Sequence, residues 1–345
     1  MAAATGPGAA PWAEVVEAVD YHTAGEPFRI VTSGVPEPAG SSVLERRDYA
    51  LRHLDHYRRL LVFEPRGHAD MYGCFLVPPE DDGALLGVLF FHNAGFSTAC
   101  GHGTIALATW AADHALVVPG GEPETAVAID VPSGRVQARI RWDGARPGTV
   151  TFRNVPSFVQ ARGLAVDTSA GRVRADIAFG GAYYASVEAA EIALPVERGN
   201  VRRLTALGRE IKDRLNRDRA AEHPSEPRLS GIYGVMFVET APGPRPGLHQ
   251  RSLTVFADGE VDRSPCGSGT SARLALLDAA GVLPPGEALV HESVIGTRFT
   301  ARVAERVTAG GQAAVVAEVA GRAFRTAEHR FVLDPRDELG TGFLL

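Results

Sequence analysis

Two seven-residue segments of the chain place a cysteine at the head of the same glycine-rich pattern. Residues 100–106 read Cys-Gly-His-Gly-Thr-Ile-Ala, and residues 266–272 read Cys-Gly-Ser-Gly-Thr-Ser-Ala, so five of the seven positions are identical. Each segment follows an apolar stretch typical of a strand and opens a stretch with helical periodicity. The repeat predicts two similar halves, each with a cysteine at a helix N-terminus.

The expected chemistry of these thiols depends on that position. The first amides of a helix have no partner inside the helix and carry the positive end of its dipole, so they can bind a carboxylate. The same field is expected to lower the pKa of a thiol and to increase its thiolate fraction. Glycines at positions 101, 103, 267 and 269 are expected to let the backbone approach a ligand without an obstructing Cβ.

Two such helices facing each other would place Cys100 and Cys266 on opposite sides of one bound α-carbon. One thiolate could remove the α-proton while the other thiol delivers a proton to the opposite face, which is two-base general acid–base catalysis. The pair would titrate as a coupled unit. Converging amides in a closed site would stabilise the carbanion-like state. This chemistry requires no cofactor and no metal ion.

Other interpretations of the cysteines explain less of the pattern. A lone buried cysteine is usually a small core hydrophobe, and this interpretation fits Cys74, which stands outside any motif. A dinucleotide fingerprint shares the glycine spacing, but neither copy is followed by a clear acidic residue about 20 positions on. A thiol redox protein would favour a Cys-x-x-Cys spacing. A binding protein for small amino acids would not need either thiol.

Composition restricts the class of protein further. The 345 residues are 45% hydrophobic and 22% charged, with a formal net charge of −6, as in an ordinary globular protein. No basic stripe with interleaved aromatics indicates a nucleic-acid partner. No apolar stretch reaches the ~18 residues of a membrane span. Residues 1–12 lack a signal-peptide pattern and predict a loose tail. We therefore expect a cytoplasmic protein with free thiols.

Alternating apolar and turn segments predict a strand-rich α+β protein. Helical periodicity marks residues 46–61, 104–116, 201–215 and 270–280. A Gly/Pro turn at residues 143–148 is the expected boundary between the halves. Segments rich in β-branched and apolar residues predict strands at residues 15–20, 28–32, 86–91, 127–131, 136–142, 149–155, 235–238, 253–257 and 313–319.

The longer segments around both cysteines resemble the two signature segments of the proline racemase superfamily. That group contains proline racemases, 4-hydroxyproline 2-epimerases and trans-3-hydroxy-L-proline dehydratases. The resemblance covers nearly the whole chain. It rests on residues 97–104 and 262–270, and on similar segments at residues 20–27, 63–68, 176–182 and 340–345.

The resemblance implies a fold and a division of the chain. The fold is that of diaminopimelate epimerase, an α+β protein of two similar halves. Each half is a sheet wrapped around a central helix, and the active site lies between them. Because the final strand of this fold returns to the first half, the first half is expected at residues 13–145 and about 321–345, and the second at 146–320. The substrate is a small molecule; the oligomeric state is left open, with a homodimer among the options.

The resemblance also implies roles for individual positions. Asp262 is implied to meet the ring nitrogen of the substrate, which is a cation and would be attracted to a carboxylate. His68 and Asp70 stand in a glycine-containing loop, and we favour a surface polar role for them over a role in the site. The remaining implied site residues are the acid/base pair Cys100 and Cys266, and the carboxylate-binding positions Gly101, His102, Gly267 and Ser268.

Two reactions fit these residues. Residues 63–73 and 92–98 most resemble the dehydratase branch, which often has threonine where this chain has Cys266. In trans-3-hydroxy-L-proline the α-hydrogen and the 3-hydroxyl share one face, so a single cysteine could remove the proton and then protonate the leaving hydroxyl. We expect a trans-3-hydroxy-L-proline dehydratase that yields Δ1-pyrroline-2-carboxylate. A 4-hydroxyproline 2-epimerase or proline racemase, which needs a proton donor on both faces, is the alternative.

Overall fold

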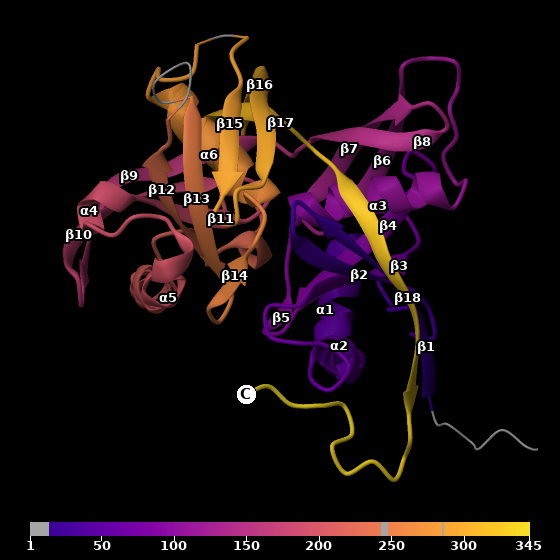
Figure 1. Ribbon diagram of the computed structural model, residues 1–345. Helices are drawn as coiled ribbons and strands as arrows, with labels where there is room; N and C mark the ends of the chain where they lie inside the picture. Colours follow the sequence, from indigo (N-terminus) through magenta and orange to yellow (C-terminus); the bar gives the residue numbers. More distant parts are fainter. Residues whose placement is uncertain (1–13, 243–247, 285) are drawn as a thin grey trace, which may run out of the picture.

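The computed structural model describes residues 14–242, 248–284 and 286–345. Within these ranges eighteen strands form one hydrogen-bonded network around two central helices. Figure 1 shows the two halves side by side, the earlier part of the chain in indigo to magenta and the later part in orange. The fold is therefore α+β with two halves, as the sequence predicted. The predicted loose tail, residues 1–12, lies outside the described residues.

The first half surrounds helix α3 (Gly101–Asp113), which is buried over residues 101–111. This helix is apolar or small on every side, as a helix enclosed by other elements must be. A pair of short helices, whose bounds are given below, packs against the sheet of this half. The strands are β1 (Glu14–Thr23), β2 (Glu26–Ser33), β3 (Tyr72–Val77), β4 (Leu86–His92), β5 (Gly95–Phe96), β6 (Glu124–Val131), β7 (Gly134–Asp143) and β8 (Arg146–Arg153).

The second half repeats this plan around helix α6 (Gly267–Ala279), buried over residues 267–277. Helix α5 (Val201–Arg217) packs on β12 and β13 through a buried apolar face, and the short α4 (Ala189–Ile192) follows β11. The strands are β9 (Ser157–Thr168), β10 (Gly171–Phe179), β11 (Tyr183–Glu188), β12 (Ile232–Thr240), β13 (His249–Phe256), β14 (Glu260–Asp262), β15 (Leu289–Ser293), β16 (Arg298–Ala309) and β17 (Gln312–Gly321).

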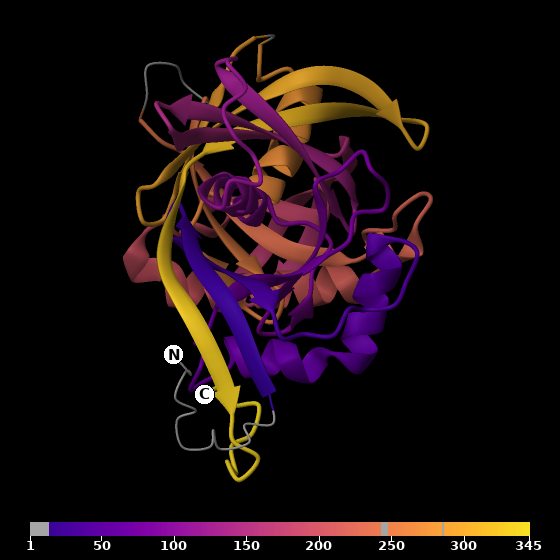
Figure 2. The ribbon, with the colours of Figure 1, turned by 90° about the vertical axis from the view of Figure 1, so that its right-hand side faces the viewer.

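The two halves are joined by strands that cross between them. Strand β17 pairs with both β8 and β9. Strand β18 (Ala323–Leu333) follows it directly and pairs antiparallel with the whole length of β1. Figure 2 shows β18, in yellow, lying along the indigo β1. The residue limits expected for the halves stay a prediction; residues 143–148, the expected boundary, run from the end of β7 into β8, and both strands pack on α3.

One helical expectation was wrong in detail. The periodic stretch at residues 46–61 forms two helices, α1 (Val43–His53) and α2 (Asp55–Val62). Leu54 leaves the helical region, with φ −120° and ψ 12°, and its N–H closes the last turn of α1 on Ala50. Asp55 then starts α2 and binds Arg58 one turn on, at 2.7 Å. The apolar spacing continues from α1 into α2, so the hydrophobic pattern of the sequence does not reveal that the helix ends at Leu54 and a new one begins at Asp55.

In the described ranges, no helix is both long enough and apolar enough to span a lipid bilayer. The three cysteines are all buried and unpaired.

Candidate active site

The N-termini of α3 and α6 meet at their first residues, in the centre of the molecule. A Cβ placed on Gly101 would lie 2.6 Å from the Cα of Gly267, and one on Gly267 would lie 2.8 Å from the Cα of Gly101. A Cβ on Gly103 would meet the ring of Phe28 at 2.5 Å. These glycines were expected to clear space for a ligand. In the structure they allow the two helix ends, and the side chains around them, to pack without a Cβ.

A narrow pocket of about 10 Å³ lies where the helix ends meet. Its walls come from both halves, and the residues named below are buried or nearly so. All seven residues predicted to form the site line this single pocket. The lining residues are Tyr72, Ala99, Cys100, Gly101, His102, Tyr184, Tyr233, Phe256, Asp262, Cys266, Gly267 and Ser268.

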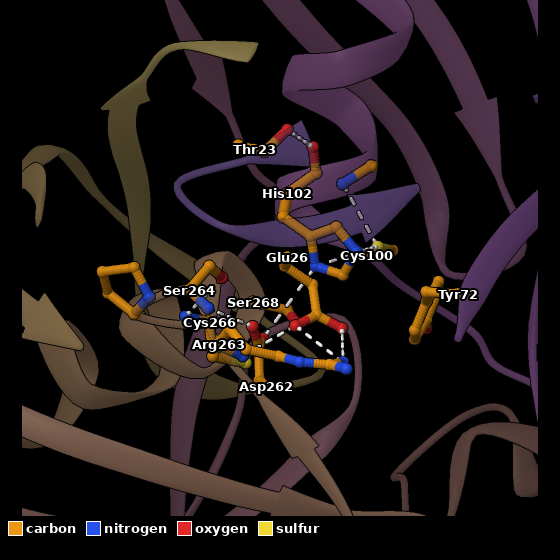
Figure 3. A network of polar contacts seen from close by, with 12 residues as sticks. Thr23, Glu26, Tyr72, Cys100, His102, Asp262, Arg263, Ser264, Cys266 and Ser268 are labelled. Carbon is orange, nitrogen blue, oxygen red and sulfur yellow. Dashed lines mark hydrogen bonds and ion pairs between the residues drawn. The ribbon is translucent and has the colours of Figure 1, made fainter. Parts of the chain in front are cut away.

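Cys100 is the N-cap residue of α3. Its sulfur accepts the N–H of Gly103 at 3.2 Å and lies 3.4 Å from Nε2 and 3.5 Å from Nδ1 of His102. The carbonyl of His102 accepts the hydroxyl of Thr23 at 2.9 Å, which fixes this turn against β1 (Figure 3). Burial lowers the pKa of His102 to about 3. The thiol therefore faces a neutral imidazole.

Cys266 is the N-cap residue of α6 and has a left-handed backbone with φ +62°. Such a conformation is strained for a residue with a side chain and needs support from its surroundings. Ser264 supplies it: its Oγ accepts the N–H of Cys266 at 3.0 Å, and its own N–H donates to Oδ1 of Asp262 at 2.8 Å. The sulfur lies 3.7 Å from the hydroxyl of Tyr184, which in turn contacts Oγ of Ser268 at 2.7 Å.

Burial raises the pKa of both active-site thiols above the ordinary value. The N–H of Gly103 opposes this at Cys100, whereas the negative charge of Asp262 adds to it at both cysteines. The expectation that the helix N-termini would increase the thiolate fraction was therefore wrong, because burial outweighs the helix amides at both thiols. The free energy needed to remove a thiolate from water exceeds the stabilisation that the helix amides give it.

Three charged residues link the halves beside the pocket. Burial raises the pKa of Asp262 to about 6. Its neighbour Arg263 donates its backbone N–H to Oε2 of Glu26 at 2.7 Å and brings Nη1 within 3.4 Å of Oε1 (Figure 3). Glu26 is completely buried, and burial raises its pKa well above the ordinary range. This contact holds the β1–β2 turn of the first half against β14 of the second.

The other residues that the sequence singled out lie outside the pocket. His68 is exposed. The Asp70 carboxylate accepts the N–H of Val261 at 3.3 Å, and the Asp70 carbonyl accepts Nη1 of Arg263 at 2.7 Å. Asp70 therefore contacts β14 and the residue that follows it. Cys74 is fully buried in the core on β3. In the described part of the chain, no group of three or more His, Cys, Asp or Glu side chains could hold a metal ion.

Besides Ala99, four aromatic pocket residues were not predicted from the sequence: Tyr72, Tyr184, Tyr233 and Phe256. They lie on four different strands and share no motif, so local spacing carries no signal for them. Tyr184 follows closely after the family segment 176–182, and a search beyond that segment could have found it. Glu26 belongs to the family segment 20–27 but was not singled out there.

The chain resembles members of one protein family in both sequence and structure. A family model described as proline racemase matches residues 18–344. The chain is 44% identical over 332 residues to a trans-3-hydroxy-L-proline dehydratase of Bacillus thuringiensis subsp. konkukian, covering 96% of this chain and 98% of that protein. It is 46% identical over 328 residues to a 3-hydroxyproline 2-epimerase of Burkholderia multivorans, covering 95% and 97%. A solved hydroxyproline epimerase of Agrobacterium vitis with bound trans-4-hydroxy-L-proline has a TM-score of 0.89 at 33% identity, covering 97% and 96%.

Proposed function

The chain belongs to the proline racemase family, and we propose that it dehydrates trans-3-hydroxy-L-proline to Δ1-pyrroline-2-carboxylate and water. The observation that carries this proposal is the convergence of both cysteines and both helix N-termini on one small pocket. Free thiols persist in a reducing compartment, and we expect the protein to act in the cytoplasm.

The pocket can bind both charged groups of an imino acid. The substrate carboxylate would accept the backbone N–H groups at the two helix starts, from Gly101 and His102 on one side and Gly267 and Ser268 on the other. The ring ammonium would lie beside Asp262, whose carboxylate form it favours. This positive charge also favours a thiolate nearby, which offsets part of the burial that raises the pKa of the thiols.

Dehydration then needs a base on one face only. The Cys100 thiolate takes the α-proton, and the electron pair of that C–H bond forms a double bond between C2 and C3. The C3–O bond breaks, and the oxygen takes the proton back from the Cys100 thiol and leaves as water. The enamine product tautomerises to Δ1-pyrroline-2-carboxylate. Cys100 begins and ends the cycle as a thiolate, so Cys266 is not consumed and need not transfer a proton.

The test compares two cysteine variants with trans-3-hydroxy-L-proline as substrate, following the product by mass spectrometry. Cys100→Ser is expected to abolish product formation, whereas Cys266→Ser is expected to retain it. Loss of dehydration in both variants would show that the one-base mechanism is wrong. An inactive wild-type protein would refute the proposed reaction.

Epimerisation is the second candidate, because Cys266 places another thiol in the same pocket. One cysteine would remove the α-proton and the other would return a proton to the opposite face. This candidate predicts α-deuterium incorporation with inversion at the α-carbon of trans-4-hydroxy-L-proline or L-proline in deuterated water, and the inversion should be lost in either cysteine variant. The absence of incorporation into both substrates would exclude it.

A binding protein without activity is distinguished by thiol labelling. Pyrrole-2-carboxylate is a planar mimic of the α-carbanion and should bind more tightly than the substrate to a site built for proton abstraction. We expect it to protect Cys100 and Cys266 from alkylation. Equal protection by a saturated imino acid at the same concentration would favour simple binding.

A further inference from the structure

Three hydroxyl groups form a chain at one wall of the pocket. Tyr72, at the start of β3 in the first half, contacts the hydroxyl of Ser97 in a short hydrogen bond. Its hydroxyl also lies 3.1 Å from the hydroxyl of Tyr233, on β12 of the second half. The chain therefore begins in one half and ends in the other, at a tyrosine that lines the pocket.

Either hydroxyl of each pair can be the donor. We consider the arrangement in which Ser97 donates to Tyr72 and Tyr72 donates to Tyr233. Each hydroxyl has one proton to donate. Two of the three protons are used inside the chain, and the proton of Tyr233 remains. Among the described residues, the Tyr233 hydroxyl hydrogen-bonds only to Tyr72.

The chain lies near both cysteines. A charge on Cys100 raises the pKa of Tyr72 and Tyr233, and a charge on Cys266 also raises that of Tyr233. The Tyr72 ring meets the edge of His102 at a centroid distance of 4.9 Å, and the Tyr233 ring meets Tyr184 at 5.9 Å. Burial raises the pKa of both phenols well above the ordinary value, so they are neutral donors and not bases. Phe256 packs against both rings, at 5.8 and 5.7 Å, and keeps the wall otherwise apolar.

We propose that Tyr233 donates a hydrogen bond to the ring hydroxyl of the substrate, and that Tyr72 and Ser97 position it. This inference rests on the proposed dehydration, in which the hydroxyl and the α-hydrogen share the face attacked by Cys100. As the C3–O bond breaks, the oxygen gains electron density and accepts a proton from the Cys100 thiol. The Tyr233 donor stabilises this oxygen throughout and remains protonated, so no further reactant is needed.

The test is Tyr233→Phe, with Tyr183→Phe as the matched control. Tyr183 is also a buried tyrosine, but its hydroxyl contacts Gln160 and the carbonyl of Glu222, away from the pocket. Tyr233→Phe is expected to lower kcat for trans-3-hydroxy-L-proline by about 10²–10³-fold, as for other donors to an oxygen that gains charge. Tyr183→Phe is expected to keep the wild-type kcat.

The binding of pyrrole-2-carboxylate separates this role from a structural one. This ligand has no ring hydroxyl, so its affinity for Tyr233→Phe should equal that for the wild type. An unchanged kcat in Tyr233→Phe, or a parallel loss of pyrrole-2-carboxylate affinity, would overturn the inference while leaving the proposed reaction intact. A wild-type protein without dehydratase activity would instead remove the reaction on which the inference rests.

Discussion

Replacing Gly101 with alanine tests whether the contact between the two helix ends holds the site together. The new Cβ would lie 2.6 Å from the Cα of Gly267 and 2.8 Å from its carbonyl carbon, closer than Cβ atoms approach other heavy atoms in proteins. Gly→Ala within a helix normally stabilises by about 0.5–1 kcal/mol. Here the obstacle is backbone, so overpacking at a cost of about 1–3 kcal/mol should exceed that gain.

The effect on catalysis should exceed the effect on stability. If the helix ends separate by about 1 Å, the thiol and the carboxylate-binding amides shift together, which can lower the rate by roughly 10²-fold. The assay combines denaturant unfolding with kcat for trans-3-hydroxy-L-proline. Gly120→Ala is the matched control: no heavy atom lies within 4 Å of its added Cβ, so it should lose neither stability nor rate. Wild-type stability and rate in Gly101→Ala would refute the reasoning.

Two further predictions concern single side chains. The ring ammonium needs the Asp262 carboxylate, whose pKa is about 6, so kcat/KM should fall as the pH falls through about 6. Because folding raises this pKa from 3.8, the folded state binds the proton more tightly. The contribution of Asp262 to stability is therefore lost as the pH rises from about 4 to 6, and denaturation of Asp262→Asn should lack that dependence. Cys74→Ala, in the core, should cost about 1 kcal/mol in unfolding and leave kcat unchanged, whereas a large loss of kcat would place this thiol in the chemistry.

Local chain geometry explains what the sequence predicted well. A cysteine before a glycine-rich turn and an apolar stretch determines a helix start by itself, so the repeat located both α3 and α6. The α+β fold was predicted from apolar segments that alternate with turns and from the few stretches with helical periodicity. The tyrosine wall could not be found in this way. Tyr72 and Tyr233 are 161 positions apart, and only the packing of two halves brings their hydroxyls to 3.1 Å.

Burial explains where the sequence interpretation failed. A helix N-terminus is visible in the sequence, and it correctly indicated amides beside Cys100. The removal of water from that thiol depends on Tyr72, Phe256 and other residues that arrive from distant strands. The direction in which the pKa of the thiol moves is therefore a tertiary property. For the same reason, the role of Gly101 becomes visible only with Gly267 in place.

The pairing of β18 with β1 has a consequence for synthesis of the protein. One edge of β1 is covered by β2, but the other is covered only by a strand made about 300 residues later in the chain, a delay of roughly 15–60 s at ordinary translation rates. During that interval the nascent chain presents an open strand edge, which other chains can recognise and join. The growing polypeptide is thus open to aggregation through this edge while it is on the ribosome, and a truncated product without its final strand would keep the edge exposed.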